Sequence, residues 1–85
     1  MNALARKLLF RSEHRGTKEM DLILGTFARN FLPTASDDEI EFYADLLMES
    51  DPDLYNWISQ REKLPDDKTN PVLKKLIGYQ VVSQR

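Results

Sequence analysis

The chain has 85 residues, no cysteine, 31% charged residues and a net charge of −2. A chain of this length forms one domain and buries only about 60–65% of the surface that its unfolded form exposes, so its interior is small. These properties exclude disulfides, thiolate metal sites and a thiol nucleophile, and they leave too little interior to enclose a dinucleotide cofactor.

Charge is distributed unevenly along the chain. Residues 1–18 have a net charge of +4, whereas residues 36–53 carry eight acidic side chains and no basic one. Solvated helix faces explain this pattern most simply, and a protein partner with complementary charge is the functional alternative. Nucleic-acid binding is disfavoured, because the chain as a whole is acidic. It would have to use the basic residues near the start, which are Arg6, Lys7, Arg11, Arg15 and Lys18.

The sequence predicts a cytoplasmic location. No apolar run approaches the roughly 18 residues needed to cross a bilayer. The Arg-rich start could be taken for a mitochondrial transit peptide, but Glu13 and the motif that follows it favour a place in the folded domain. The absence of cysteine suits a reducing compartment.

The spacing of apolar residues is helical from the start of the chain. Residues 3–13 predict a short first helix with Leu4, Leu8 and either Phe10 or Arg11 near one side, and Gly16 breaks it. A second helix is predicted from Thr17 to a point before Pro33. Its buried stripe consists of apolar side chains spaced three and four residues apart, namely Met20, Ile23, Leu24, Phe27 and Phe31.

Three further helices are predicted from their capping signals. Ser36 and Glu39 form a capping box, in which the serine oxygen accepts from the third amide and the glutamate reaches back. Asp51-Pro52 predicts an N-cap with proline at the first helical position, and Asn70-Pro71 repeats this signal. Their apolar sides are expected to be Ile40, Tyr43 and Leu47 (flanked by Phe42 and Leu46), then Leu54, Trp57 and Ile58, then Val72, Leu73, Leu76 and Ile77.

Residues 62–70 form the one clear loop, and the tail after Gly78 is expected to fray. No alternating strand pattern occurs. The predicted fold is therefore all-α, a compact bundle of five short helices in a single domain that spans residues 1–85.

The first motif is Arg15-Gly16, followed by Glu19. If Gly16 is the N-cap of the second helix, Glu19 takes the third helical position and stabilises the positive end of that helix. In the functional alternative, Gly16 lets a partner approach closely, while Glu19 holds the Arg15 guanidinium so that it binds a carboxylate. His14 precedes the motif and is most simply a solvated side chain. With no second His and no Cys, a transition-metal site is not expected.

The second motif is the string DPDLYNW at residues 51–57. Its acidic residues and its proline suit the start of a helix. A core role is the simplest for Trp57, although tryptophan is also enriched at binding hot spots. Tyr55 and Asn56 fall off the apolar side and face water or a partner.

The two motifs, in this order and spacing, resemble the SdhE family of bacterial assembly factors and their mitochondrial relatives. The resemblance rests on Arg15-Gly16-x-x-Glu19-x-Asp21, on the capping box that begins at Ser36, and on residues 51–57. It extends from about residue 3 to about residue 80, and residues 62–85 match only in their pattern.

This resemblance implies a five-helix factor, not an enzyme, that binds the flavoprotein subunit of succinate dehydrogenase, and in some bacteria of fumarate reductase. It implies that the factor promotes covalent attachment of FAD to that partner, holds no cofactor stably itself and is a monomer when free. The implied partner-binding residues are Arg15, Gly16 and Glu19, followed by Asp21 and Trp57.

Other functions stay open from the residues alone. A small helical regulatory module that docks on a different protein partner would use the same arginine-anchored surface. A small enzyme that uses His14 and nearby carboxylates as acid and base lacks the other residues of a catalytic site.

Overall fold

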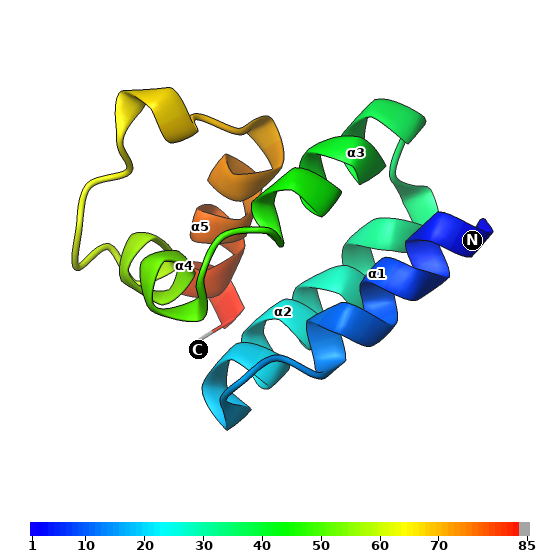
Figure 1. The fold of residues 1–85 in the computed structure, drawn as a ribbon, viewed down its shortest axis with the longest axis horizontal. Helices are drawn as coiled ribbons and strands as arrows, with labels where there is room; N and C mark the ends of the chain where they lie inside the picture. Colours follow the sequence, from blue (N-terminus) through cyan, green and yellow to red (C-terminus); the bar gives the residue numbers. More distant parts are fainter. Residues whose placement is uncertain (84–85) are drawn as a thin grey trace.

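The computed structural model describes residues 1–83, which fold into five α-helices and two short 3-10 helices (Figure 1). The α-helices are α1 (Ala3–Glu13), α2 (Lys18–Phe31), α3 (Asp37–Leu46), α4 (Asp51–Ile58) and α5 (Pro71–Ser83). The 3-10 helices are η1 (Leu32–Thr34) and η2 (Asp66–Lys68). Residues 1–83 contain no strand, so the prediction of an all-α, five-helix fold is confirmed.

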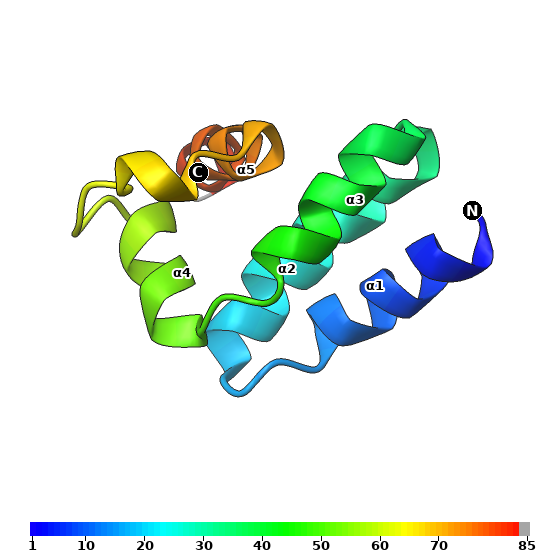
Figure 2. The same cartoon turned by 45° about the horizontal axis from the view of Figure 1, so that its top comes forward.

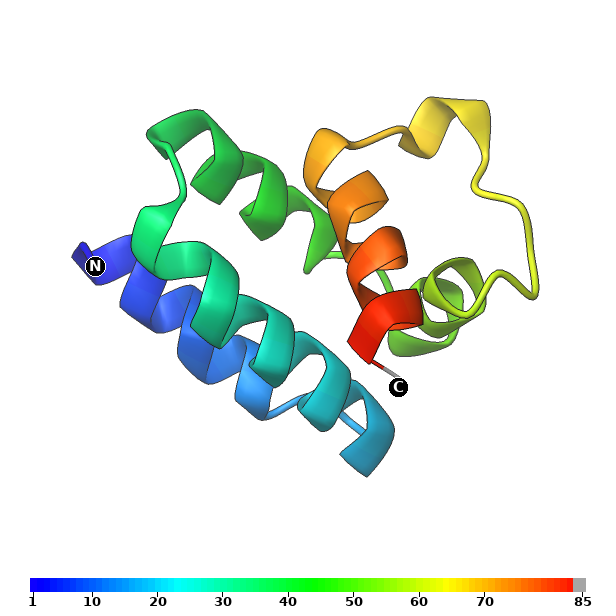
Figure 3. The same ribbon diagram turned by 180° about the vertical axis from the view of Figure 1, so that it is seen from behind.

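Helix α5 connects two parts of the fold, with α1, α2 and α3 on one side and α4 on the other. In Figures 1 and 2, α1 and α2 run side by side with α3 next to them, and α4 lies far from the N-terminus. Figure 3 shows the same fold from behind, with α5 between α3 and α4. Helix α5 contacts α2, α3 and α4, and α3 also contacts α1. This arrangement places the α1–α2 connection close to the start of α4.

Capping residues explain where most helices begin, and two of them differ by one position from the prediction. Ser36 and Glu39 form the predicted capping box, and the Asn70 side chain accepts from two amides at the start of α5. The predicted N-cap at Gly16 is wrong, because the Thr17 hydroxyl takes that place and accepts from the amide of Met20 at 3.2 Å.

Helix α4 shows the same displacement. Ser50, and not Asp51, is its N-cap, since the Ser50 hydroxyl accepts from the amide of Asp53 at 3.3 Å. Asp51 and Pro52 are consequently the first two helical residues. At the other end of the chain, α5 continues past Gly78, where fraying was expected, to Ser83; residues 84–85 of that predicted tail lie outside the described range.

The core contains one face of each helix, and Trp57 belongs to it with 5% exposure, as expected for a core residue. Helix α1 departs from the prediction. Ala5, Leu8 and Ser12 form its buried face, whereas Leu4 and Phe10 are exposed. Small side chains at positions 5 and 12 let α1 pack closely against its neighbours, an arrangement that a search for large apolar residues overlooks.

Candidate functional site

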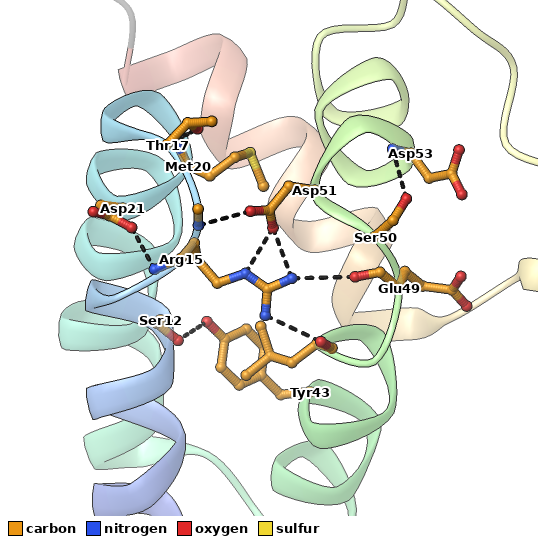
Figure 4. A network of polar contacts seen from close by, with 12 residues as sticks. Ser12, Arg15, Thr17, Met20, Asp21, Tyr43, Glu49, Ser50, Asp51 and Asp53 are labelled. Carbon is orange, nitrogen blue, oxygen red and sulfur yellow. Dashed lines mark hydrogen bonds and ion pairs between the residues drawn. The ribbon is translucent and has the colours of Figure 1, made fainter.

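The α1–α2 connection and the start of α4 are joined by one ion pair. Arg15 lies on that connection, and its Nε donates to Asp51 Oδ1 at 2.8 Å. Its Nη2 lies 2.7 Å from the same oxygen (Figure 4). Both side chains are largely buried, with 14% and 19% exposure. The two predicted motifs therefore meet in space through a charge-assisted contact, the stronger kind of hydrogen bond.

The guanidinium of Arg15 also binds the end of α3. Nη1 donates to the Leu47 carbonyl at 3.0 Å, and Nη2 donates to the Glu49 carbonyl at 3.1 Å. Leu47 is the C-cap of α3 and Glu49 lies in the turn that follows. Carbonyls at the end of a helix lack partners within that helix, and a cation there is favourable. Arg15 thus ties the end of α3 to the start of α4. We refer to Arg15, Asp51, Leu47 and Glu49 with these contacts as the Arg15 clamp.

Gly16 binds the clamp through its backbone. Its N–H donates to Asp51 Oδ2 at 2.9 Å, so Asp51 binds two successive residues of the α1–α2 connection. A Cβ atom at position 16 would lie 3.1 Å from the same oxygen. Gly16 does not have a positive φ. A glycine at position 16 therefore lets the backbone lie close to Asp51, and it is not required by an unusual backbone conformation.

The remaining predicted site residues take different places. Glu19 is exposed in the first turn of α2, where a carboxylate suits the helix dipole. The expectation that Glu19 holds Arg15 is wrong, because Asp51 does so. Asp21 accepts a hydrogen bond from the backbone N–H of Arg15 and thereby fixes the connection. Trp57 is buried in the core, apart from the exposed face.

Asp51 is the central residue that the sequence reasoning assigned only to a helix start. A carboxylate at a helix N-terminus has a sufficient local explanation, so nothing in the second motif alone points to Arg15. The available signal was the joint presence of an arginine in one motif and an aspartate in the other.

A hydroxyl pair lies buried below the clamp. Tyr43 Oη and Ser12 Oγ are 2.5 Å apart, and Ser12 Oγ donates to the Leu8 carbonyl at 2.8 Å, so Tyr43 donates to Ser12. Burial raises the pKa of Tyr43 to about 12, although the Ser12 hydrogen bond and the positive charge of Arg15 act in the opposite direction. Tyr43 is therefore a neutral hydrogen-bond donor at neutral pH.

The outer side of the clamp borders a shallow hollow of about 680 Å³ that is open to solvent. Phe10 lines it from α1, His14 from the C-cap of that helix, and Met48 from the turn after α3. The Phe10 and His14 rings stack at 4.1 Å between centroids, and His14 Nδ1 lies 2.7 Å from the Phe10 carbonyl. A smaller hollow of about 180 Å³ lies beside it, lined by Thr17, Glu19, Met20, Asp51, Pro52 and Tyr55.

Neither a metal-binding cluster nor a membrane span occurs in residues 1–83. These residues contain no group of three or more His, Asp or Glu side chains placed to hold a metal ion. Within the same range, no helix has the length and apolar character needed to cross a membrane.

These features define a small all-α protein in which an ion pair and a backbone hydrogen bond join the two sequence motifs. The family model described as "Flavinator of succinate dehydrogenase" matches residues 6–80. The chain belongs to this family.

Curated relatives agree with the family match. The chain is 35% identical over 75 residues to the FAD assembly factor SdhE of Acetobacter pasteurianus. This match covers 88% of the chain and 69% of the relative. The chain is 38% identical over 71 residues to succinate dehydrogenase assembly factor 2, mitochondrial, of Dictyostelium discoideum, covering 84% of the chain. The protein of that name from Komagataella phaffii is 43% identical over 75 residues, covering 84% of the chain. The chain spans 50% and 40% of the last two relatives.

Proposed function

We propose that this protein binds the flavoprotein subunit of succinate dehydrogenase and promotes covalent attachment of FAD to that subunit. The family match over residues 6–80 carries this proposal. The names of the relatives, which refer to succinate dehydrogenase assembly and to FAD assembly, support it. The proposal includes a cytoplasmic location, a monomeric free state and, as a second partner, the flavoprotein of fumarate reductase.

The docking face in this proposal is the exposed side of the Arg15 clamp. Gly16 and Glu19 are exposed there, and the backbone at Gly16 is open to close approach by a partner. Arg15 and Asp21 act mainly from within, because their contacts with Asp51 and with the backbone fix the shape of the connection. Trp57 contributes by holding α4 in the core.

FAD is proposed to remain with the flavoprotein. The hollow beside Arg15 is open to solvent, whereas cofactor sites bury most of the surface of what they bind. The flavin supplies the electron sink for its own attachment. The protein then acts by selecting a flavoprotein conformation in which the acceptor side chain is aligned with the flavin, and orientation alone is a large effect in such reactions.

The direct test is co-expression of the flavoprotein subunit with and without this protein. Flavin fluorescence of the flavoprotein band on a denaturing gel reports only covalently bound flavin. We expect fluorescence to increase with the wild-type protein and to fall when Asp51→Asn replaces it, because Asp51 organises the docking face.

A negative result has a clear meaning. Equal fluorescence in every lane contradicts the proposed activity. If a pull-down under the same conditions then recovers a different protein partner, the alternative of a helical regulatory module takes its place.

A further inference from the structure

We propose that the hollow between α1 and the end of α3 receives an apolar side chain of the flavoprotein, next to a carboxylate of the same partner segment. This inference rests on the proposed function and extends it to residues outside the motifs. The residues that recognise the segment are Phe10 and Met48 for the apolar side chain and Arg11 for the carboxylate.

Two large apolar side chains border this hollow without being buried. Phe10 is 62% exposed and Met48 is 78% exposed, and they come from separate segments that face the same depression. Single exposed apolar residues are common on any surface, but two that line the same hollow from different segments are typical of a binding site. Aromatic residues and methionine are also enriched where interfaces are buried.

The Phe10 ring is held in place before any partner binds. It stacks on His14, whose Nδ1 atom is 2.7 Å from the Phe10 carbonyl. A side chain that is already ordered loses less conformational entropy when it becomes buried in an interface. His14 is thus a positioning residue for Phe10.

The positive charge near the hollow indicates which polar group the partner segment carries. Helix α1 carries Arg6, Lys7 and Arg11, and its one acidic residue, Glu13, is bound to Arg29 at 2.7 Å. Asp51, the acidic residue that lines the hollow, is bound by Arg15 and Gly16. The rim at Arg11 is therefore positive, and a carboxylate is its complement.

The test measures the dissociation constant of the purified protein for the apo-flavoprotein subunit at low and at high salt. The variants are Phe10→Ala, Met48→Ser and Arg11→Gln, and circular dichroism checks the fold of each. Leu22→Ala is the matched control, because Leu22 is 67% exposed on α2 and does not line the hollow. Lys63→Gln, in the loop before α5, is the control for loss of one exposed positive charge.

We expect Phe10→Ala and Met48→Ser each to weaken binding about tenfold or more, as is usual for residues at the centre of an interface. Arg11→Gln should reduce the salt dependence of binding, since that dependence reports a charge contact. Leu22→Ala and Lys63→Gln should bind within about twofold of the wild type.

Three results would overturn the inference, and they are distinguishable. If Phe10→Ala and Met48→Ser bind as the wild type does while Asp51→Asn binds weakly, the proposed function stands and this surface is not part of it. If the wild type does not bind the flavoprotein at all, the proposed function fails as well. If the variants instead change the oligomeric state of the protein alone in gel filtration, the surface pairs copies of this chain.

Discussion

Asp51 holds Arg15 and Gly16 at the same time: one carboxylate oxygen binds the guanidinium and the other accepts the Gly16 N–H. A single side chain at the start of α4 therefore fixes both residues of the Arg-Gly motif. The motif is stabilised from within the protein, so a substitution of Asp51 should disturb its structure as much as a substitution of Arg15.

Asp51→Asn should lower the free energy of unfolding by about 2–3 kcal/mol, because it leaves the largely buried guanidinium without its counter-charge. Urea unfolding followed by circular dichroism measures the change. Asp53→Asn is the control, since Asp53 is an exposed acidic residue in the same first turn and should cost about 0.3–1 kcal/mol. Equal losses in both variants would show that Asp51 acts only through the helix dipole.

Gly16→Ala should reduce flavinylation of the partner and leave the stability of the fold almost unchanged. The added Cβ would lie 3.1 Å from Asp51 Oδ2, which disfavours the variant. The loss of backbone freedom in the unfolded chain favours it by about 0.4–1 kcal/mol. We therefore expect almost no net change in the urea midpoint and a clear loss of flavinylation in the co-expression assay. A large drop in stability would mean that Gly16 serves folding alone.

Trp57→Ala should lower the free energy of unfolding by about 3–5 kcal/mol through the cavity that it leaves in the core. Urea unfolding is again the measurement, and Trp57→Phe should recover part of the loss. Loss of flavinylation in Trp57→Ala is then expected to follow the fraction unfolded. A stable Trp57→Ala variant that fails to bind the flavoprotein would instead place Trp57 in direct contact with it.

The raised pKa of Tyr43 predicts that the folded protein loses stability at alkaline pH. Its pKa rises from its usual value near 10 to about 12 in the folded protein. The folded state therefore holds the Tyr43 proton more tightly than the unfolded chain does. The resulting contribution to the free energy of unfolding is complete below pH 10 and is lost as the pH rises toward 12. Two pKa units correspond to about 3 kcal/mol.

Tyr43→Phe tests this dependence. Ser12 keeps its hydrogen bond to the Leu8 carbonyl in the variant, so the loss at neutral pH should be only about 1 kcal/mol. The difference between the unfolding free energies of the two proteins should shrink and then reverse as the pH rises, because only the wild type carries the titrating hydroxyl. Parallel curves would contradict the raised pKa of Tyr43.

Local patterns were enough to predict most of the fold. The apolar stripe of α2 and the capping signals at Ser36 and Asn70 depend on neighbours within a turn or two, so they can be recognised in the chain itself. The N-caps of α2 and α4 were each misplaced by one residue, since adjacent positions offer chemically similar caps.

The candidate site was less accessible to such reasoning. The contact between Arg15 and Asp51 joins residues 36 positions apart. Asp51 had an adequate local explanation at a helix start, and Arg15 was paired with Glu19, its neighbour in the same motif. The exposure of Phe10 depends on how closely α1 packs through Ala5 and Ser12, which periodicity does not encode. Long-range pairing and close packing of small residues are therefore what the sequence pattern missed.

The Arg15 clamp joins two connections that are distant in sequence, so the proposed docking face is discontinuous along the chain. A synthetic peptide that contains only the first motif has no Asp51 to hold its arginine, and one that contains only the second has no Arg15. Neither peptide should compete with the whole domain for the flavoprotein. An inhibitor that imitates this surface would have to reproduce two chain segments at a fixed separation.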